Sequence, residues 1–400
     1  MKCRIFCAVV LALTSCGLTE IGGGDNAGSV QGGIWGGPLD EGASGVLDQI
    51  CYITALDYQK GYDWKSDSSR ESVKCSLVVY ADGKLIMKVP VGDVYEVSAD
   101  PDMHRIIDGQ LYTDYSTDSE TVIKKNGAPL FRYQGRESIC GIAVRSDDVY
   151  TLGQNRSGDG FAYRKNGEIL FSRPSGVVMG QLRTADDSLC FAYFDRIQSA
   201  DGPVERYYSV CEGKVTQIAV RDDIKKVWDI IGTDTSVIYL ASMVGVDTPV
   251  LIDNDRMTAL AMQKNVTVVS ATLSESDGSI GAEIMYRSGS SCNTLLWFNG
   301  MVARIFGDGT TVSSLHMLDN GICCAVNPAS PSSKGVIYRC GEQFEMPLGY
   351  NCVGSEAVSM VNGILHAGLS SINNGRPILW RDGQVDTLKI NGYISSVSAQ

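Results

Sequence analysis

Two-residue turns recur along the chain at a nearly constant spacing, and this regularity constrains the fold more than any other feature. Eight such turns interrupt short apolar runs, and the gaps between their second residues are 44, 40, 46, 41, 46, 41 and 42. Asn-Gly and Asp-Gly pairs supply the positive φ that a two-residue hairpin requires. A period of about 43 residues is typical of one four-stranded blade of a β-propeller. The turns are Asp82-Gly83, Asn126-Gly127, Asn166-Gly167, Glu212-Gly213, Asp253-Asn254, Asn299-Gly300, Cys340-Gly341 and Asp382-Gly383.

A second series of turns falls inside each period, ahead of another apolar run. Each unit therefore reads as strand A, a tight turn, strand B, a longer loop, strand C, a tight turn and strand D. No stretch after Cys16 keeps helical spacing, so the predicted fold class is all-β. The second series is Asp108-Gly109, Asp147-Asp148, Asp186-Asp187, Thr235-Ser236, Asp277-Gly278, Asn320-Gly321 and Asn362-Gly363.

The two series differ in number, because there are eight C–D turns and seven A–B turns. The first unit begins at strand B, over residues 50–54, and the chain ends with a spare strand over residues 393–397. If the spare strand supplies strand A of the first blade, the ring closes and no sheet edge stays open. We predict a single propeller over residues 47–400, with eight four-stranded blades closed by the C-terminal strand. A seven-bladed ring with one irregular hairpin is the alternative.

The N-terminal segment predicts export. A basic start and an apolar run over residues 5–13, too short to span a bilayer, precede Leu13-Thr14-Ser15-Cys16. This sequence resembles the lipobox of bacterial lipoproteins, which implies a signal peptide over residues 1–15 and a lipid anchor on Cys16. An ordinary secretory signal is the alternative. Residues 16–46 are rich in glycine and predict a flexible tether. The residue directly after Cys16 is Gly17 and not Asp, which favours an outer-membrane lipoprotein on the periplasmic side or the cell surface.

The repeats also resemble a known family. Residues 148–153 read DVYTLG, residues 163–168 read YRKNGE, residues 295–300 read LLWFNG and residues 379–383 read LWRDG. Together they are similar to the degenerate DVYxxG and YWKNG repeats of exported propeller lipoproteins from Bacteroidales-type bacteria, over most of residues 92–390. This resemblance implies a propeller in the cell envelope, and it brings no catalytic residues.

The longer B–C and D–A connections share one face of the predicted ring, where binding residues are expected. The longest insertion, over residues 58–72, contains Tyr62 and Trp64, which could stack on sugar rings or anchor a protein partner. A loop folded onto its own aromatic side chains is the alternative. Arg136, Arg173 and Arg221 fall in D–A connections near the channel mouth and could recognise an acidic glycan or a carboxylate. Solvated charges beside acidic neighbours are the alternative.

The sequence predicts no catalytic residue, metal site or cofactor. His104, His316 and His366 are isolated, without His-x-x-x-His or Cys-x-x-Cys spacing. Gly-x-Ser-x-Gly and phosphate-binding loops are also missing from the sequence. Paired carboxylates contributed by several blades stay open, because the spacing along the sequence does not reveal them.

Ten cysteines follow Cys16, and six of them bracket predicted B–C loops. In an exported chain these six predict disulfides, each worth roughly 3 kcal/mol. Small buried apolar side chains are the alternative. The pairs are Cys51 with Cys75, Cys190 with Cys211, and Cys324 with Cys340.

The net charge of −12 argues against a nucleic-acid partner, which would require clustered lysine and arginine. We therefore expect a non-enzymatic cell-envelope lipoprotein whose propeller binds a glycan, peptide or protein partner on its long-loop face. A polysaccharide-active enzyme, a hydrolase or lyase with carboxylates in the central channel, is one alternative. A structural subunit of an envelope complex is another.

Overall fold

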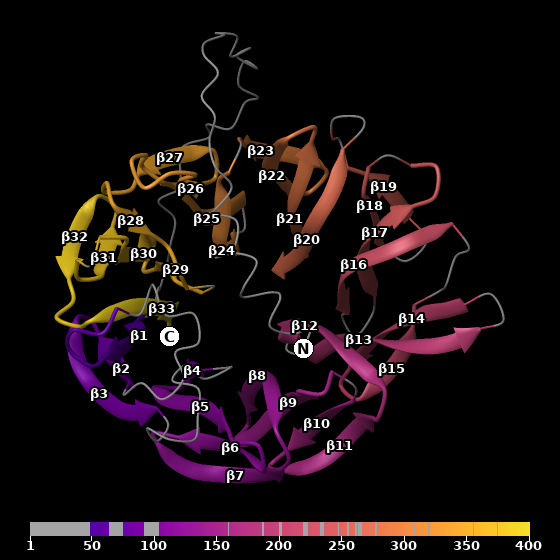
Figure 1. Ribbon diagram of the computed structural model, residues 1–400, viewed down its shortest axis with the longest axis horizontal. Helices are drawn as coiled ribbons and strands as arrows, with labels where there is room; N and C mark the ends of the chain where they lie inside the picture. Colours follow the sequence, from indigo (N-terminus) through magenta and orange to yellow (C-terminus); the bar gives the residue numbers. More distant parts are fainter. Residues whose placement is uncertain are drawn as a thin grey trace, which may run out of the picture.

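The computed structural model describes residues 49–63, 75–91 and 104–400, apart from 159, 186–187, 200–201, 219–222, 233–235, 247, 254–255, 261, 263–265, 277, 308, 319–320, 355 and 374. Within this part of the chain all regular structure is β, and eight antiparallel sheets stand around a central axis (Figure 1). The prediction of an eight-bladed β-propeller is confirmed. The expected signal peptide, Cys16 and the tether up to residue 46 lie outside the described residues.

Blades 1 to 4 take up the first half of the described chain. Their strands, from the centre of the ring outward, are β33 (Gly392–Ala399), β1 (Cys51–Tyr58), β2 (Cys75–Ala81) and β3 (Lys84–Val91) in blade 1; β4 (His104–Ile107), β5 (Gln110–Ser116), β6 (Glu120–Lys125) and β7 (Ala128–Gln134) in blade 2; β8 (Glu137–Arg145), β9 (Asp148–Asn155), β10 (Phe161–Lys165) and β11 (Glu168–Arg173) in blade 3; and β12 (Gly176–Ala185), β13 (Ser188–Ser199), β14 (Gly202–Cys211) and β15 (Lys214–Gln217) in blade 4.

Blades 5 to 8 follow the same order, except that the innermost strand of blade 8 is divided into β28 and β29. They are β16 (Ile224–Gly232), β17 (Val237–Met243), β18 (Val250–Asp253) and β19 (Arg256–Ala259) in blade 5; β20 (Thr267–Ser276), β21 (Ser279–Ser288), β22 (Ser291–Phe298) and β23 (Met301–Phe306) in blade 6; β24 (Thr311–Leu318), β25 (Gly321–Asn327), β26 (Val336–Arg339) and β27 (Glu342–Glu345) in blade 7; and β28 (Tyr350–Asn351), β29 (Val358–Val361), β30 (Ile364–Ser371), β31 (Ile378–Arg381) and β32 (Gln384–Thr387) in blade 8.

The C–D turns have the backbone conformation that their sequence predicts. In blade 3, Asn166 has φ 50° and Gly167 has φ 86°, so both central residues of the turn occupy the left-handed region. The Asn166 side chain also fixes the neighbouring hairpin, since its Oδ1 accepts a hydrogen bond from the Val149 amide at 2.9 Å. Asn126 makes the same bond to Leu111 in blade 2, also at 2.9 Å. One residue type thus shapes its own turn and joins strand C to strand B.

Apolar side chains of neighbouring blades pack into eight clusters among the described residues, with one cluster at each of the eight contacts between blades. The cluster between blades 8 and 1 contains Leu379 and Leu388 from blade 8 together with Ile53, Ile394 and Val397 from blade 1. The ring is therefore closed by a core of the same kind as its other contacts.

The C-terminal strand β33 completes blade 1, because it pairs with β1 along its length (Figure 1). A backbone hydrogen bond from Ile50 to the Gln400 carbonyl, at 2.8 Å, joins the first described residues to the end of the chain. The first described strand and the C-terminal strand thus meet in one sheet, as the count of turns predicts.

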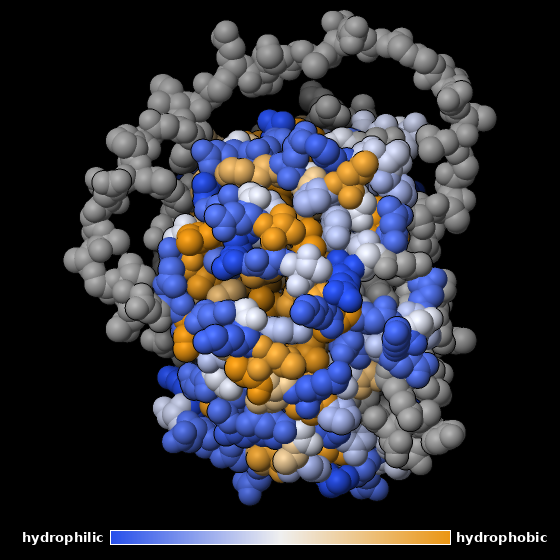
Figure 2. All heavy atoms as spheres, turned by 90° about the vertical axis from the view of Figure 1, so that its left-hand side faces the viewer, coloured by the Kyte–Doolittle hydropathy of each residue, from blue (hydrophilic) through white to orange (hydrophobic). Residues whose placement is uncertain are grey.

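Most of the outer strands leave apolar side chains exposed among the described residues. Leu85 and Ile86 on β3 are 54% and 50% exposed, Ile169 on β11 is 60% exposed, and Val385 on β32 is 46% exposed. On the side formed by blades 8 and 1, apolar and hydrophilic side chains alternate over the surface (Figure 2). In the described part of the chain, no helix has the length and apolar character needed to cross a membrane.

Candidate functional site

The innermost strands face the central channel, and irregularities in their pairing decide which side chains point into it. In β24 the register shifts between Ser313 and His316, so that two residues lie opposite one residue of β25. Similar shifts occur in β12, before Arg183, and in β16, before Asp229. A bulge of this kind turns the following side chains to a new direction. The strands that build the channel therefore depart from strict alternation where their polar residues lie.

A cavity of about 410 Å³ occupies the channel and is lined by innermost segments of six blades. Arg105, Arg183, Ser274 and His316, from blades 2, 4, 6 and 7, each occupy the third position from the end of an innermost strand. The repeat thus places them at one level, near the A–B turns. The lining residues are Arg105, Arg183, Thr184, Ile231, Leu273, Ser274, Glu275, Leu315, His316, Met317 and Glu356.

Arg105 joins three blades across the channel. Its guanidinium donates to Glu356 Oε1 in blade 8 at 2.8 Å and to Gln181 Oε1 in blade 4 at 3.2 Å. Its Nε atom is buried and has no hydrogen-bond partner among the described residues. Arg105 therefore has one donor that the surrounding side chains leave unused.

Arg183 pairs with a carboxylate at the wall of the channel. It donates to Asp229 Oδ2 at 2.9 Å and to the Leu273 carbonyl at 3.3 Å. Asp229 is only 5% exposed, and it also accepts from the amides of Leu273 and Ile230, each at 2.8 Å. These bonds connect blades 4, 5 and 6 and compensate both charges.

His316 is an uncharged polar group in the cavity wall at neutral pH. Burial lowers the pKa of the imidazole, and the nearby Glu356 carboxylate acts in the opposite direction with a smaller effect. The Nε2 atom is buried and has no hydrogen-bond partner among the described residues. His316 thus offers the cavity a neutral ring nitrogen.

At the bulge before His316, a side chain accepts a hydrogen bond from a backbone amide of the next blade, and the same kind of bond is found elsewhere in the ring. Ser314, with φ 58°, accepts a hydrogen bond from the Val358 amide of the next blade at 2.7 Å. Asp229 does the same for Leu273, and the two residues of each bond are 44 positions apart. Both bonds therefore join an innermost strand to its equivalent one repeat later. This contact holds the bulged strands, and hence the cavity wall, in place.

Of the aromatic and arginine residues predicted from the sequence, the described ones, Tyr62, Arg136 and Arg173, do not line this cavity. Tyr62 packs against the core between blades 1 and 2, and its ring centroid lies 5.4 Å from that of Tyr58. Arg136 pairs with Asp118 at 3.0 Å, and Arg173 donates to the Tyr193 hydroxyl at 3.3 Å. Tyr62 is therefore part of the packing between blades 1 and 2. Trp64 and Arg221 lie outside the described residues.

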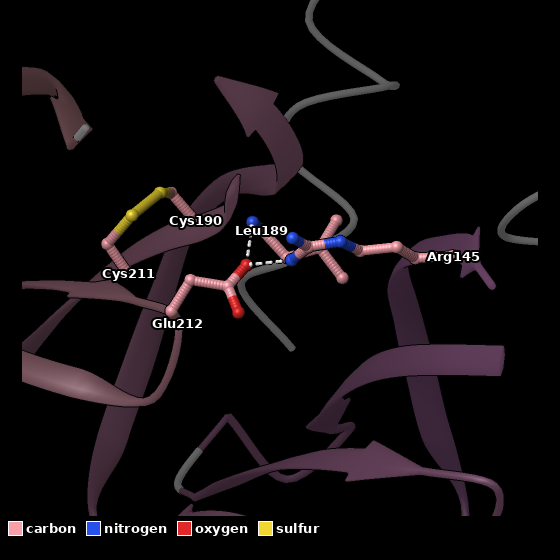
Figure 3. The surroundings of a disulfide bond; sticks show 5 residues. All are labelled: Arg145, Leu189, Cys190, Cys211 and Glu212. Carbon is pink, nitrogen blue, oxygen red and sulfur yellow. Dashed lines mark hydrogen bonds and ion pairs between the residues drawn. A yellow bond between two sulfur atoms is a disulfide. The ribbon is translucent and has the colours of Figure 1, made fainter. Parts of the chain in front are cut away.

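The structure forms one of the three predicted disulfides, between Cys190 and Cys211 (Figure 3). These two residues are directly opposite each other on β13 and β14, with 4.2 Å between their Cα atoms. Beside the bond, Glu212 accepts from the Leu189 amide at 2.8 Å and from Arg145 of blade 3 at 2.6 Å. The disulfide thus adjoins a contact between blades 3 and 4.

The other two disulfide predictions are wrong, and the strand register explains why. Cys75 lies opposite Tyr58, at the far end of β1 from Cys51, so the ladder separates the two cysteines by roughly 20 Å. Cys324 lies opposite Tyr338, so Cys340 is its diagonal neighbour and no bond joins them. Cys51 and Cys324 are buried thiols whose pKa is raised by burial, which fits the alternative of small core side chains.

Sequence reasoning missed the channel residues, although one signal pointed to them. Aligning the units at their A–B turns would have placed Arg105, Arg183 and Ser274 at equivalent positions of the innermost strand, each three residues before the turn, with His316 one position earlier. No group of three metal-ligating side chains is found in the part of the chain that the structure describes. The cavity therefore provides hydrogen-bond donors and acceptors, in pairs of opposite charge.

No protein-family model matches the chain, and no curated protein matches it. Among solved structures, dihydro-heme d1 dehydrogenase has a TM-score of 0.51 at 11% identity, with 88% of this chain and 74% of that chain covered. The β-propeller domain of the Trilobed protease from Pyrococcus furiosus has a TM-score of 0.45 at 10% identity, with 74% and 92% covered. The acylaminoacyl peptidase of Pyrococcus horikoshii has a TM-score of 0.46 at 11% identity, with 85% and 57% covered. At these identities the likeness concerns the fold alone. The chain is a β-propeller protein.

Proposed function

We propose that the protein is a non-enzymatic binding lipoprotein of the cell envelope, whose propeller binds a glycan, peptide or protein partner. The observation that supports this proposal is the channel cavity, in which six blades bring polar side chains around one hollow. Rigid scaffolds that present a few polar groups in a concave site are typical of ligand binding. The cavity lies near the A–B turns, so we place the ligand there and no longer on the long-loop face.

The ion pairs in the channel support binding over catalysis. Glu356 faces the Arg105 guanidinium at 2.8 Å, and Asp229 faces Arg183 at 2.9 Å. Each carboxylate already accepts a charge-assisted hydrogen bond from an arginine of another blade. These two carboxylates are therefore suited to positioning the arginines.

The mature protein in detergent, applied to a glycan array and used to capture partners from a lysate, tests the proposal. We expect saturable binding of a glycan or protein, and we expect the Arg105→Gln variant to retain less of it. Arg132→Gln is the matched control, since Arg132 forms an exposed ion pair with Glu120 on the outer part of blade 2. Failure to bind any glycan or protein, together with cleavage of a polysaccharide, would contradict the proposal.

The lipid anchor is part of the same proposal and has its own test. A chain carrying Cys16→Ser should lose fatty-acid labelling and move from the membrane fraction to the soluble fraction, because the thiol is the acylated group. Cys7→Ser is the matched control, since it changes a cysteine of the same N-terminal segment without touching the lipobox. Equal labelling of both variants would show that Cys16 is not lipidated.

A polysaccharide-active enzyme is the second candidate, because Glu275 and Glu356 both line the cavity. Glycoside hydrolysis commonly uses two carboxyl groups that flank the scissile bond. In that case a polysaccharide panel would yield new reducing ends or unsaturated products, and Glu275→Gln would abolish them. Turnover that survives this substitution would place the chemistry elsewhere.

A further inference from the structure

We infer that the channel cavity holds the uncharged end sugar of a glycan, which forms hydrogen bonds with Arg105, Glu275 and His316. This inference rests on the proposed binding function and names the chemistry of its ligand. Three features carry it: the size of the cavity, two unused polar atoms in its wall, and the charge pairing of its side chains.

The size of the cavity suits one small polar unit. Its volume of about 410 Å³ falls near the lower end of the range for small-molecule sites, roughly 300 to 1,000 Å³. The wall includes Leu273, Leu315 and Met317 beside its polar groups, so apolar side chains limit the space around a ligand. A monosaccharide unit fits such a hollow, whereas a folded protein segment does not.

Two buried nitrogen atoms lack hydrogen-bond partners among the described residues, and their side chains line the same cavity. They are Nε of Arg105 on β4 and Nε2 of His316 on β24. A buried polar atom without a hydrogen-bond partner destabilises the protein, because it has lost its bond to water. A ligand oxygen within reach of these atoms would supply the missing hydrogen-bond partner. The two atoms are therefore suited to bind polar groups of a ligand.

Both arginines that line the cavity are already paired within the protein. Arg105 pairs with Glu356, and Arg183 pairs with the buried Asp229. An anionic ligand would have to compete with Glu356 and Asp229 for these two guanidinium groups. Hydroxyl groups instead add hydrogen bonds without disturbing the charge balance, because each one can donate and accept.

Glu275 supplies the acceptor that a hydroxyl ligand needs. Its Oε1 accepts from the Gly278 amide at 2.9 Å, which fixes the carboxylate beside the A–B turn of blade 6. The carboxylate has further lone pairs for a ligand hydroxyl. Together, Glu275 accepts while Arg105 donates, and the neutral His316 ring does either according to its tautomer.

Saturation-transfer NMR on the mature protein in detergent tests this inference with a defined panel. The panel contains methyl glycosides of glucose, galactose, mannose and N-acetylglucosamine, with glucuronate and galacturonate as anionic analogues and glucosamine as the cationic analogue. We expect an uncharged glycoside to bind and its charged analogue to bind at least tenfold more weakly. A preference for a uronate or for glucosamine would overturn the inference.

Variants locate the sugar within the molecule. Glu275→Gln and His316→Leu should each weaken binding of the preferred glycoside about tenfold, because each removes one hydrogen bond to it. His316→Gln keeps a polar group and serves as the second variant if His316→Leu fails to fold. His366→Gln is the matched control, since His366 lies outside the cavity and bonds to the Ile364 carbonyl. Unchanged binding in the Glu275 and His316 variants would overturn the inference.

The outcomes separate this inference from the proposed function. A glycan or protein that binds the intact chain, but whose binding is unaffected by the cavity variants, refutes the sugar site and leaves the binding function standing. Failure of every glycan and lysate protein to bind refutes both. Loss of the glycoside signal in the cavity variants alone supports both.

Discussion

Glu283 is the clearest case of a residue whose environment opposes its ionisation. It lies on β21 opposite Leu296, on the face that packs toward blade 7, and burial raises the pKa of its carboxyl from 4.5 to about 7. Because this pKa is higher in the folded than in the unfolded protein, the folded state binds more protons between pH 4.5 and 7. Stability therefore falls as pH rises through this window, and the loss is complete above it.

Glu283→Gln should raise stability above pH 7 by roughly 2–3 kcal/mol and change it little near pH 5. The amide has a similar shape and carries no charge that must be buried. Urea unfolding midpoints at about pH 5 and pH 8 measure the difference. Glu168→Gln is the control, since Glu168 is exposed on β11 and should have little effect at either pH. An equal effect of Glu283→Gln at both pH values would show that ionisation is not the cause.

The pair of Glu137 and Arg164 shows the opposite case, a buried charge that is fully compensated. The guanidinium donates to both carboxylate oxygens, at 2.8 and 2.7 Å, and both side chains are less than 10% exposed. Arg164 also lies 4.0 Å from the centre of the Tyr133 ring of blade 2. The pair therefore sits where blades 2 and 3 meet.

Glu137→Leu should destabilise the protein by about 3–5 kcal/mol, because it leaves Arg164 buried without a counter-charge. The double variant Glu137→Leu with Arg164→Met should recover much of this loss, since it removes both charges. The exposed pair of Arg132 and Glu120 is the control, and breaking it with Glu120→Ala should cost less than about 1 kcal/mol. Denaturant unfolding of the wild type and these three variants measures these values. A double variant as unstable as the single one would contradict the explanation.

Among the elements, strands and turns could be read from the sequence because their signals are local. Asn166 and Gly167 form their turn with positive φ wherever the blade lies in the ring. The channel site could not be read in the same way. In β24 a bulge interrupts alternation just before His316, and the partners Arg105 and Glu356 are 251 positions apart. Only the assembled ring brings such residues together.

The pairing of cysteines depends on the register between strands B and C, and this register can be predicted only partly from the sequence. Symmetry about the B–C loop predicted the Cys190–Cys211 bond, because β13 and β14 pair with Cys190 opposite Cys211. The same reasoning failed for Cys51 and Cys75, since the insertion after β1 is not centred between the two cysteines. A sequence midpoint is thus a guide only when both strands extend equally from their loop.

The disulfide in blade 4 should contribute to the stability of its hairpin by roughly 3 kcal/mol, because it closes a loop of 21 residues in the unfolded chain. We expect the double variant Cys190→Ala with Cys211→Ala to lower the free energy of unfolding by this amount and to lower the denaturant midpoint accordingly. Thiol titration of the denatured, unreduced protein should show two fewer thiols than the reduced protein. Cys324→Ala, a buried thiol outside any bond, controls for the loss of sulfur volume. A midpoint equal in the double variant and the wild type would show that the bond is not formed.

For the whole molecule, the turn count predicted that the ring is closed, and the structure shows which contacts close it. Strand β33 brings Ile394 and Val397 into the cluster between blades 8 and 1, and Ser396 forms a bridge to Glu356 beside the channel. Closure therefore supports both the core and the wall of the candidate site. An open ring would expose the edge of β1 to pairing with other molecules.

Removing residues 392–400 should consequently lower the melting temperature by roughly 10 °C or more and cause aggregation, because blade 1 loses its innermost strand and two contacts between blades lose core side chains. A synthetic peptide of residues 392–400, added in excess, should restore part of the stability by pairing with β1. Deleting residues 17–46 is the matched control, because these residues precede β1 and the ring keeps all its strands. Calorimetry and light scattering measure both effects. A truncated chain that melts within about 2 °C of the full chain would mean that the other contacts hold the ring without β33, and the binding cavity should then also survive the deletion.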